Sequence, residues 1–167
     1  MSEVSLSSLV ASAKIIIRKL AMERKYEILE HMADGKFRAY GSNLEEALGN
    51  AALAMVSLMW DWEKIRPVLR ETIQLEASSP EQLTVKFLTE LIYLLEVKSF
   101  LLGRADKIGI EEDDQNGKKI YRLKAEIAGD RLSPDYEIYG QVKAVTYNDM
   151  KIEKTDDSLV IQVVVDM

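Results

Sequence analysis

The sequence contains a single histidine, His31, and an aspartate follows it three positions later, at Asp34. The two side chains could form a catalytic pair, contribute to a metal site, or be polar residues at the end of a strand. The chain has no cysteine, which excludes disulfides, thiolate nucleophiles and Cys-ligated zinc. A lone histidine also argues against a His-rich zinc or iron centre. Any metal is therefore expected to be held by oxygen, which favours calcium, magnesium or manganese.

Two further residues lack a simple structural role. Asp166 follows the apolar run VIQVVV and precedes Met167, where the chain given ends. The Asp166 carboxylate and a terminal carboxylate on Met167 would be two anionic groups at the end of a buried strand, which is costly unless a cation joins them. Alternatively, Asp166 points into solvent. Lys143 interrupts the apolar strand sequence VKAVTY. It could lie on an exposed sheet face or pair with carboxylates at the same end of the sheet.

Composition limits the classes of function. The chain has 167 residues, 47% hydrophobic and 30% charged, which suits one globular domain, and no apolar run approaches the length of a membrane helix. The net charge is −6, with +3 in residues 1–25 and −9 in the remainder. Such an acidic body is a poor direct binder of nucleic acid, so contact with RNA is expected through a partner. There is no phosphate-binding glycine loop and no G-x-S-x-G nucleophile motif.

Hydrophobic periodicity indicates the elements that must position these residues. Residues 1–24 contain an amphipathic helix, and residues 26–30 and 36–40 are expected to be strands. A capping box from Ser42 to Glu45 starts a core helix whose apolar stripe runs to Met59. After a strand at 68–77, Ser79-Pro80-Glu81-Gln82 starts a second core helix.

The rest of the chain is predicted to be β-structure. Extended segments are expected at 100–102 and 108–112, and QNGK at 115–118 is typical of a hairpin turn that leads into an alternating strand. The acidic run at 111–114 lacks the spacing of a calcium loop and is interpreted as a solvated hairpin end. Strands are also expected at 141–147 and 159–167, the last one central because both its faces are apolar. The prediction is one α+β domain with two core helices and about eight strands.

Several motifs together resemble the archease family. The segment KYEILEHMADGKFRAYGSNLEEAL is similar to the family's opening pattern, Y-E-x-x-x-H-T-A-D followed by an alternating stretch and G-x-[ST]-L-E-E. The resemblance continues through NAALAM and MWD, returns at VKAVTY, and closes with VVVDM. It covers residues 25–167, with the motifs in the family's order, and leaves residues 1–24 as an N-terminal extension.

The resemblance implies a fold and a function. Archeases are compact α+β domains with helices packed between β-sheets, and they are cytoplasmic accessory proteins of the RtcB-type tRNA-splicing RNA ligase. They are thought to promote GTP-dependent and metal-dependent guanylylation of the ligase without being enzymes themselves. RNA would then be contacted indirectly, through the ligase. The family is also linked to tRNA methyltransferases, which leaves a chaperone-like modulator as an alternative; a free-standing metal-dependent phosphohydrolase is a third.

The family's site residues can be carried over one by one. The metal ligands fall on Asp34, Asp166 and Met167, the last through its backbone or terminal oxygen, and the ion is expected to be one divalent cation, calcium with magnesium or manganese as alternatives. The functionally important lysine falls on Lys143, expected to contact the partner or its nucleotide site. His31 is expected to be a positioning or core residue.

The chain departs from the family pattern at four positions near these motifs, without touching the expected ligands. Met32 replaces a threonine, Gly35 follows the aspartate, and Tyr136 and Asn148 stand where histidines are often found.

Overall fold

The computed structural model describes residues 7–9, 24–29 and 34–167. A helix was predicted within residues 1–24, most of which lie outside the described residues. The part that is described includes residues 7–9, which are helical. None of the helices in the described part of the chain combines the length and apolarity needed to cross a membrane.

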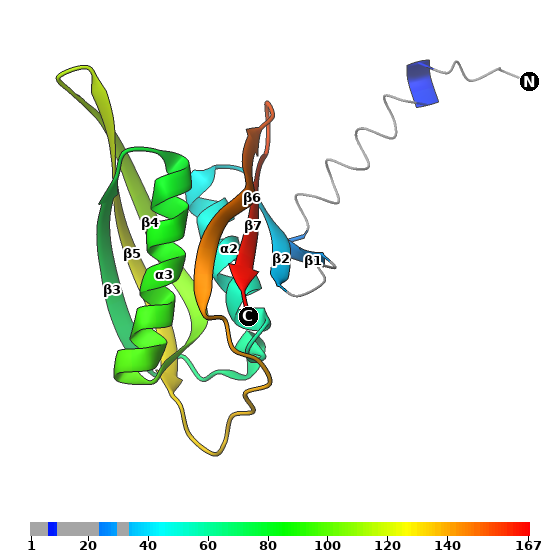
Figure 1. Ribbon diagram of the computed structural model, residues 1–167, viewed down its shortest axis with the longest axis vertical. Helices are drawn as coiled ribbons and strands as arrows, with labels where there is room; N and C mark the ends of the chain where they lie inside the picture. The colour runs from blue at the N-terminus through cyan, green and yellow to red at the C-terminus, as the bar shows by residue number, and fades with distance from the viewer. Residues whose placement is uncertain (1–6, 10–23, 30–33) are drawn as a thin grey trace, which may run out of the picture.

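Two antiparallel sheets enclose the helices (Figure 1). The four-stranded sheet has the order β1-β2-β7-β6, with β1 at Tyr26–Leu29, β2 at Gly35–Gly41, β7 at Leu159–Asp166 and β6 at Ala144–Lys154. The three-stranded sheet has the order β3-β5-β4, with β3 at Leu69–Ala77, β5 at Lys118–Arg131 and β4 at Phe100–Gln115.

Two long helices form the layer between the sheets. They are α2 at Leu44–Ser57 and α3 at Pro80–Lys98, and a single 3-10 turn, η1, follows α2 at Trp62–Lys64. Most of α2 is buried, because both sheets pack against it; its buried residues include Ala47, Leu48, Ala51 and Ala52. The predicted architecture, one α+β domain with two core helices between β-sheets, is confirmed.

The start of α2 differs by one residue from the prediction. The N-cap is Asn43, whose side-chain oxygen accepts a hydrogen bond from the main-chain N–H of Glu46 at 2.9 Å. Ser42 lies outside the helix and its hydroxyl donates to the Glu46 carboxylate. The capping box predicted from Ser42 to Glu45 is therefore wrong in register, because an amide oxygen at position 43 caps as well as a hydroxyl does.

The other local signals are confirmed. Ser79 caps α3 by accepting a hydrogen bond from the N–H of Gln82, and Pro80 occupies its first turn. At the β4–β5 turn, Asn116 and Gly117 both have positive φ, 53° and 78°. This is the backbone that an Asn-Gly hairpin turn requires.

Two strand predictions were wrong in extent. The segments predicted at 100–102 and 108–112 are parts of one strand, β4, whose pairing with β5 is interrupted by register shifts near Gly103 and Asp106. The strand predicted at 141–147 continues as β6 to Lys154, with a bulge between Thr146 and Lys151. The described residues therefore form seven strands instead of about eight, since bulges break the alternation that a sequence pattern detects.

The cap of α2 gives a test of its register. Replacing Asn43 with Ala removes the acceptor for the Glu46 N–H and is expected to lower the free energy of unfolding by about 1 kcal/mol. Ser42→Ala is the matched control and should cost less than half as much, because Ser42 contacts only an exposed carboxylate. Urea unfolding of both variants measures the difference; equal losses would contradict the assignment of Asn43 as the cap.

Candidate functional site

One end of the four-stranded sheet brings together residues that are distant in the sequence. β2 pairs with β7 so that Gly35 lies opposite Val165, and β6 pairs with β7 so that Ala144 lies opposite Asp166. Continuing the β2–β7 register by one residue places Asp34 opposite Asp166. The main-chain N–H of Lys143 donates to the carbonyl oxygen of Asp166 at 2.8 Å. The backbone register therefore places Asp34, Lys143 and Asp166 at the same end of the sheet, called the sheet end below.

The alternation of β7 determines the direction of Asp166. Val163 and Val165 have no exposed surface and belong to the core that packs on the helices. Asp166, the next residue, falls on the opposite, outer face of the sheet and is exposed. Asp34 is half-buried and Lys143 is exposed. The Asp166 carboxylate can therefore meet an ion or a partner from solution.

The side chain of Met167 packs against the backbone at two glycines, Gly35 and Gly140. A Cβ atom on Gly35 would lie 3.1 Å from the Met167 sulfur, and one on Gly140 would lie 3.5 Å from its terminal methyl carbon. Leu58, at the end of α2, lies against both glycines. The thioether therefore contacts the protein, and the main-chain oxygens of Met167 follow directly after Asp166.

A bulge in β6 covers the outer face of β7. Asp149, in the bulge, has a φ of 54°, and its carbonyl accepts a hydrogen bond from the Gln162 amide at 2.8 Å. Its carboxylate pairs with the Lys36 ammonium, also at 2.8 Å. Arg38 donates to the Gln162 side-chain oxygen at 3.0 Å. Gln162, only 3% exposed, is thus bonded at both ends of its amide, although it lies on the outer face.

Lys36, Asp149 and Gln162 were not predicted from the sequence to lie near this site. A signal was present, since the polar pair Asn148-Asp149 interrupts the strand pattern after VKAVTY. Asparagine and aspartate are the non-glycine residues that most readily adopt positive φ, so this pair could have indicated a bulge.

The donor set at the sheet end fits a hard cation. It offers two side-chain carboxylates, from Asp34 and Asp166, and the adjoining main-chain oxygen of Met167, which are ligands that calcium and magnesium prefer. Within the described ranges no group of three or more His, Cys, Asp or Glu side chains is arranged to hold a metal. A cation here would therefore need main-chain oxygen and water as well as the two aspartates. His31 lies outside the described residues, so its position relative to Asp34 is not assigned.

The sequence matches one family of known proteins. The sequence model of the archease protein family (MTH1598/TM1083) matches residues 26–167. The chain is 39% identical over 145 residues to a protein archease of Methanosarcina mazei, covering 86% of this chain and 97% of that one. It is 40% identical over 135 residues to a protein archease of Thermococcus kodakarensis, covering 80% of this chain and 92% of that one.

A solved structure shows the same fold. The solution structure of Methanobacterium thermoautotrophicum protein 1598 matches with a TM-score of 0.69 and 26% sequence identity. The match covers 86% of this chain and 99% of that one. The similarity therefore includes both sheets and the helices between them.

The close approach at Gly140 gives a test of how the sheet end is held. In Gly140→Ala the new Cβ would lie 2.1 Å from the Leu58 carbonyl oxygen, so the backbone must move and the free energy of unfolding is expected to fall by about 2 kcal/mol. Gly109→Ala is the control, because the nearest atom to its Cβ is 4.0 Å away. Equal stabilities of the two variants in urea unfolding would contradict this packing.

Proposed function

The chain belongs to the archease family, and on this premise we propose that it is a non-catalytic accessory protein that activates an RtcB-type tRNA-splicing RNA ligase. It would act by docking on the ligase and promoting GTP-dependent guanylylation, so that the ligase completes many turnovers. The observation that supports the proposal is the strand register, which places Asp34, Lys143 and Asp166 at the same end of the sheet.

The exposure of the sheet end supports action on a partner. Asp166 and Lys143 are exposed, and neither of the two larger hollows on the molecule, of about 660 and 700 Å³, includes a sheet-end residue. An enzyme that binds a small substrate normally encloses it in a concave pocket. An exposed group of charges is better suited to being presented to another protein's active site.

The charges at the sheet end suggest separate roles for its residues. Asp34 and Asp166, with the main-chain oxygen of Met167, would hold one divalent cation, for which calcium is the leading candidate, with magnesium and manganese as alternatives. The ion would supply positive charge and coordination beside the docked partner. Lys143 would contribute an ammonium group, which suits contact with a phosphate of the ligase's nucleotide. RNA would be held by the ligase, because the acidic body of this chain repels phosphates.

Guanylylation of the ligase tests the proposal directly. Mixing the protein with its cognate ligase, GTP and Mn²⁺ is expected to increase the rate of ligase–GMP formation. Asp166→Asn and Lys143→Ala should each reduce this stimulation by about 10-fold or more, as loss of groups around a metal typically does. The matched control is Asp114→Asn, which removes one carboxylate from the exposed β4–β5 hairpin.

Three outcomes would contradict the proposal or favour an alternative function. Unchanged guanylylation with the native protein rejects activation of the ligase. Turnover of a phosphate ester by the isolated chain, abolished by Asp34→Asn, would favour a phosphohydrolase. Specific capture of a tRNA methyltransferase in place of the ligase would favour a chaperone-like modulator.

Cation binding can be measured without the ligase. Titration calorimetry with Ca²⁺ is expected to show one site, and Asp34→Asn or Asp166→Asn should weaken binding by about 10-fold or more, because each removes a charged ligand. The Asp114→Asn protein should bind like the native one. If all three variants bind Ca²⁺ equally well, the two aspartates are not its ligands.

A further inference from the structure

A third and smaller hollow, which includes none of the sheet-end residues, lies beside the C-terminal end of α2. Its volume is about 380 Å³, and it is bordered by β1, the segment that follows α2, and the β5–β6 connection at 132–143. Five aromatic residues line it, namely Tyr26, Trp60, Trp62, Tyr136 and Tyr139. The sequence has only two tryptophans, so both of them are at this place. It is called the aromatic hollow below.

Hydrogen bonds hold the aromatic rings in place. The Trp62 indole N–H donates to the Tyr26 hydroxyl at 2.9 Å, and the Trp60 indole N–H donates to the Leu102 carbonyl at 2.9 Å. The Tyr139 hydroxyl donates to the Ser57 carbonyl at 2.7 Å, while its main-chain N–H donates to the Met59 carbonyl at 2.9 Å. The polar atoms are thus used within the protein. Trp60 is buried and supports the hollow from below, whereas Tyr26, Trp62 and Tyr136 are half-buried and Tyr139 is exposed, so these four rings remain as contact surfaces.

The aromatic hollow carries negative charge. Asp61, Asp135 and Glu137 line it, against a single basic residue, Lys64. The last turn of α2 contains no basic residue, so the partial negative charge of its C-terminus is not offset there. A cation is therefore attracted to this place, whereas an anion is repelled.

Tyr139 reports this environment. Burial is the first cause that raises the pKa of its phenol, and the neighbouring Asp61, Tyr26 and Glu137 raise it further. The carboxylates of Asp61 and Glu137, which come from two different segments of the chain, therefore both lie close enough to Tyr139 to disfavour its ionised form.

Two carboxylates in the aromatic hollow are not used for ion pairs. Among the described residues, no hydrogen bond or salt bridge uses the Glu137 carboxylate, and Asp61 uses one oxygen to accept the N–H of Glu63. Asp135 differs, because it pairs with Arg66 at 3.1 Å. Asp61 and Glu137 are thus available to a cation from outside.

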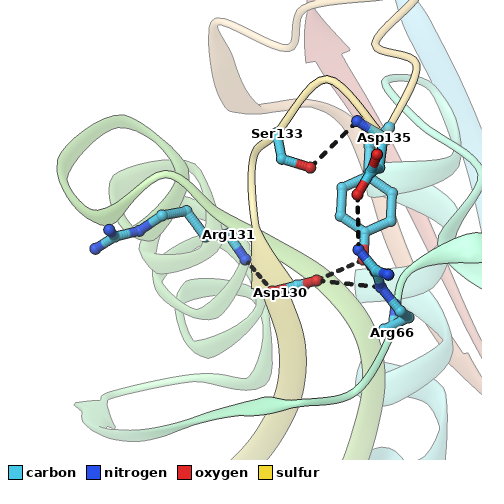
Figure 2. Close-up of polar contacts among 6 residues, drawn as sticks. Arg66, Asp130, Arg131, Ser133 and Asp135 are labelled. Carbon is cyan, nitrogen blue, oxygen red and sulfur yellow. Dashed lines mark hydrogen bonds and ion pairs between the residues drawn. The ribbon is translucent and has the colours of Figure 1, made fainter.

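The rim of the aromatic hollow already shows what kind of cation fits. Figure 2 shows Arg66 beside Asp130 and Asp135, with which it forms ion pairs. The guanidinium lies 5.4 Å from the centre of the Tyr136 ring and donates to the Tyr136 hydroxyl at 2.9 Å. The Tyr136 hydroxyl donates in turn to Asp130, and this bond is the main cause that lowers the pKa of the Asp130 carboxyl. A guanidinium is thus bound here by an aromatic face together with carboxylates.

A second contact between a cation and an aromatic ring occurs at Trp62. The Lys25 ammonium lies 4.8 Å from the centre of the Trp62 ring. Neither Lys25 nor Arg66 lines the aromatic hollow itself, so both cations lie outside it. The aromatic rings that border the hollow therefore already attract cations from this chain at their outer sides.

We propose that the aromatic hollow binds an arginine side chain presented by a protein partner. The exposed ring of Tyr139, with the half-buried rings beside it, would stack on the planar guanidinium, and Asp61 and Glu137 would accept its hydrogen bonds. Arginine suits this arrangement better than lysine does, because a guanidinium is planar and forms several directed hydrogen bonds. A nucleic acid is disfavoured, because its phosphates would meet the carboxylates. This proposal does not depend on the identity of the partner or on activation of the ligase.

The aromatic hollow is linked to the sheet end by the β5–β6 connection. Tyr139 lines the hollow, and the next residue, Gly140, packs against Leu58 and the Met167 side chain. A partner that places an arginine in the hollow would thus lie beside the residues of the sheet end.

Nuclear magnetic resonance can test the proposal on the full chain. The probe is the peptide acetyl-Gly-Arg-Gly-amide, and the reporters are the indole N–H signals of Trp60 and Trp62. We expect the arginine peptide to shift the Trp62 signal saturably. A peptide with citrulline in place of arginine has nearly the same shape without the charge and should produce little shift. Equal shifts from the two peptides would overturn the proposal.

Two variants separate this site from general attraction to an acidic protein. Asp61→Asn combined with Glu137→Gln removes both available carboxylates and keeps an N-cap oxygen at position 61, and it should weaken binding of the arginine peptide by about 10-fold. Asp114→Asn on the distant hairpin should leave the affinity unchanged. If the double variant binds as tightly as the Asp114→Asn protein, the carboxylates of the hollow do not hold the guanidinium.

Discussion

The structure depends on the burial of β7 on both of its faces. Val163 and Val165 belong to the core that packs on the helices, while Val164, on the opposite face of the sheet, is 2% exposed. The outer face is covered by the bulge of β6, which is attached to it through Gln162 and Lys36. Because β7 is buried, its pairing with both neighbours is strongly specified, since a shift of one residue would turn its apolar side chains to the opposite faces.

That register is what assembles the sheet end. β7 ends at Asp166, and the neighbouring strands β2 and β6 position the residues beside it. Asp34 and Lys143 reach Asp166 because β2 and β6 pair with β7 on either side. The candidate ligands therefore do not need a dedicated loop. The main chain that carries Asp166 is positioned by the same hydrophobic core that stabilises the domain.

Much of the fold follows from local sequence signals. The central position of β7, the Asn-Gly hairpin and the two core helices were predictable, because each rests on apolar periodicity or on turn residues with a specific backbone requirement. The bulges of β4 and β6 were not predicted, since an extra residue reverses the alternation and the pattern then suggests a break. The cap at Asn43 was missed because Ser42 offered an equally good local signal. The aromatic hollow could not be predicted, because Trp62 and Tyr139 approach one another only through tertiary packing.

The central claim is that Asp34 and Asp166 act as one unit in activating the ligase. A double-mutant cycle measures this most directly, with ligase–GMP formation compared for native protein, Asp34→Asn, Asp166→Asn and the double variant. If both aspartates hold the same cation, either single substitution already removes the site, and the double variant should be no worse than the more severe single variant. Losses that multiply in the double variant, or full stimulation by both single variants, would contradict the claim.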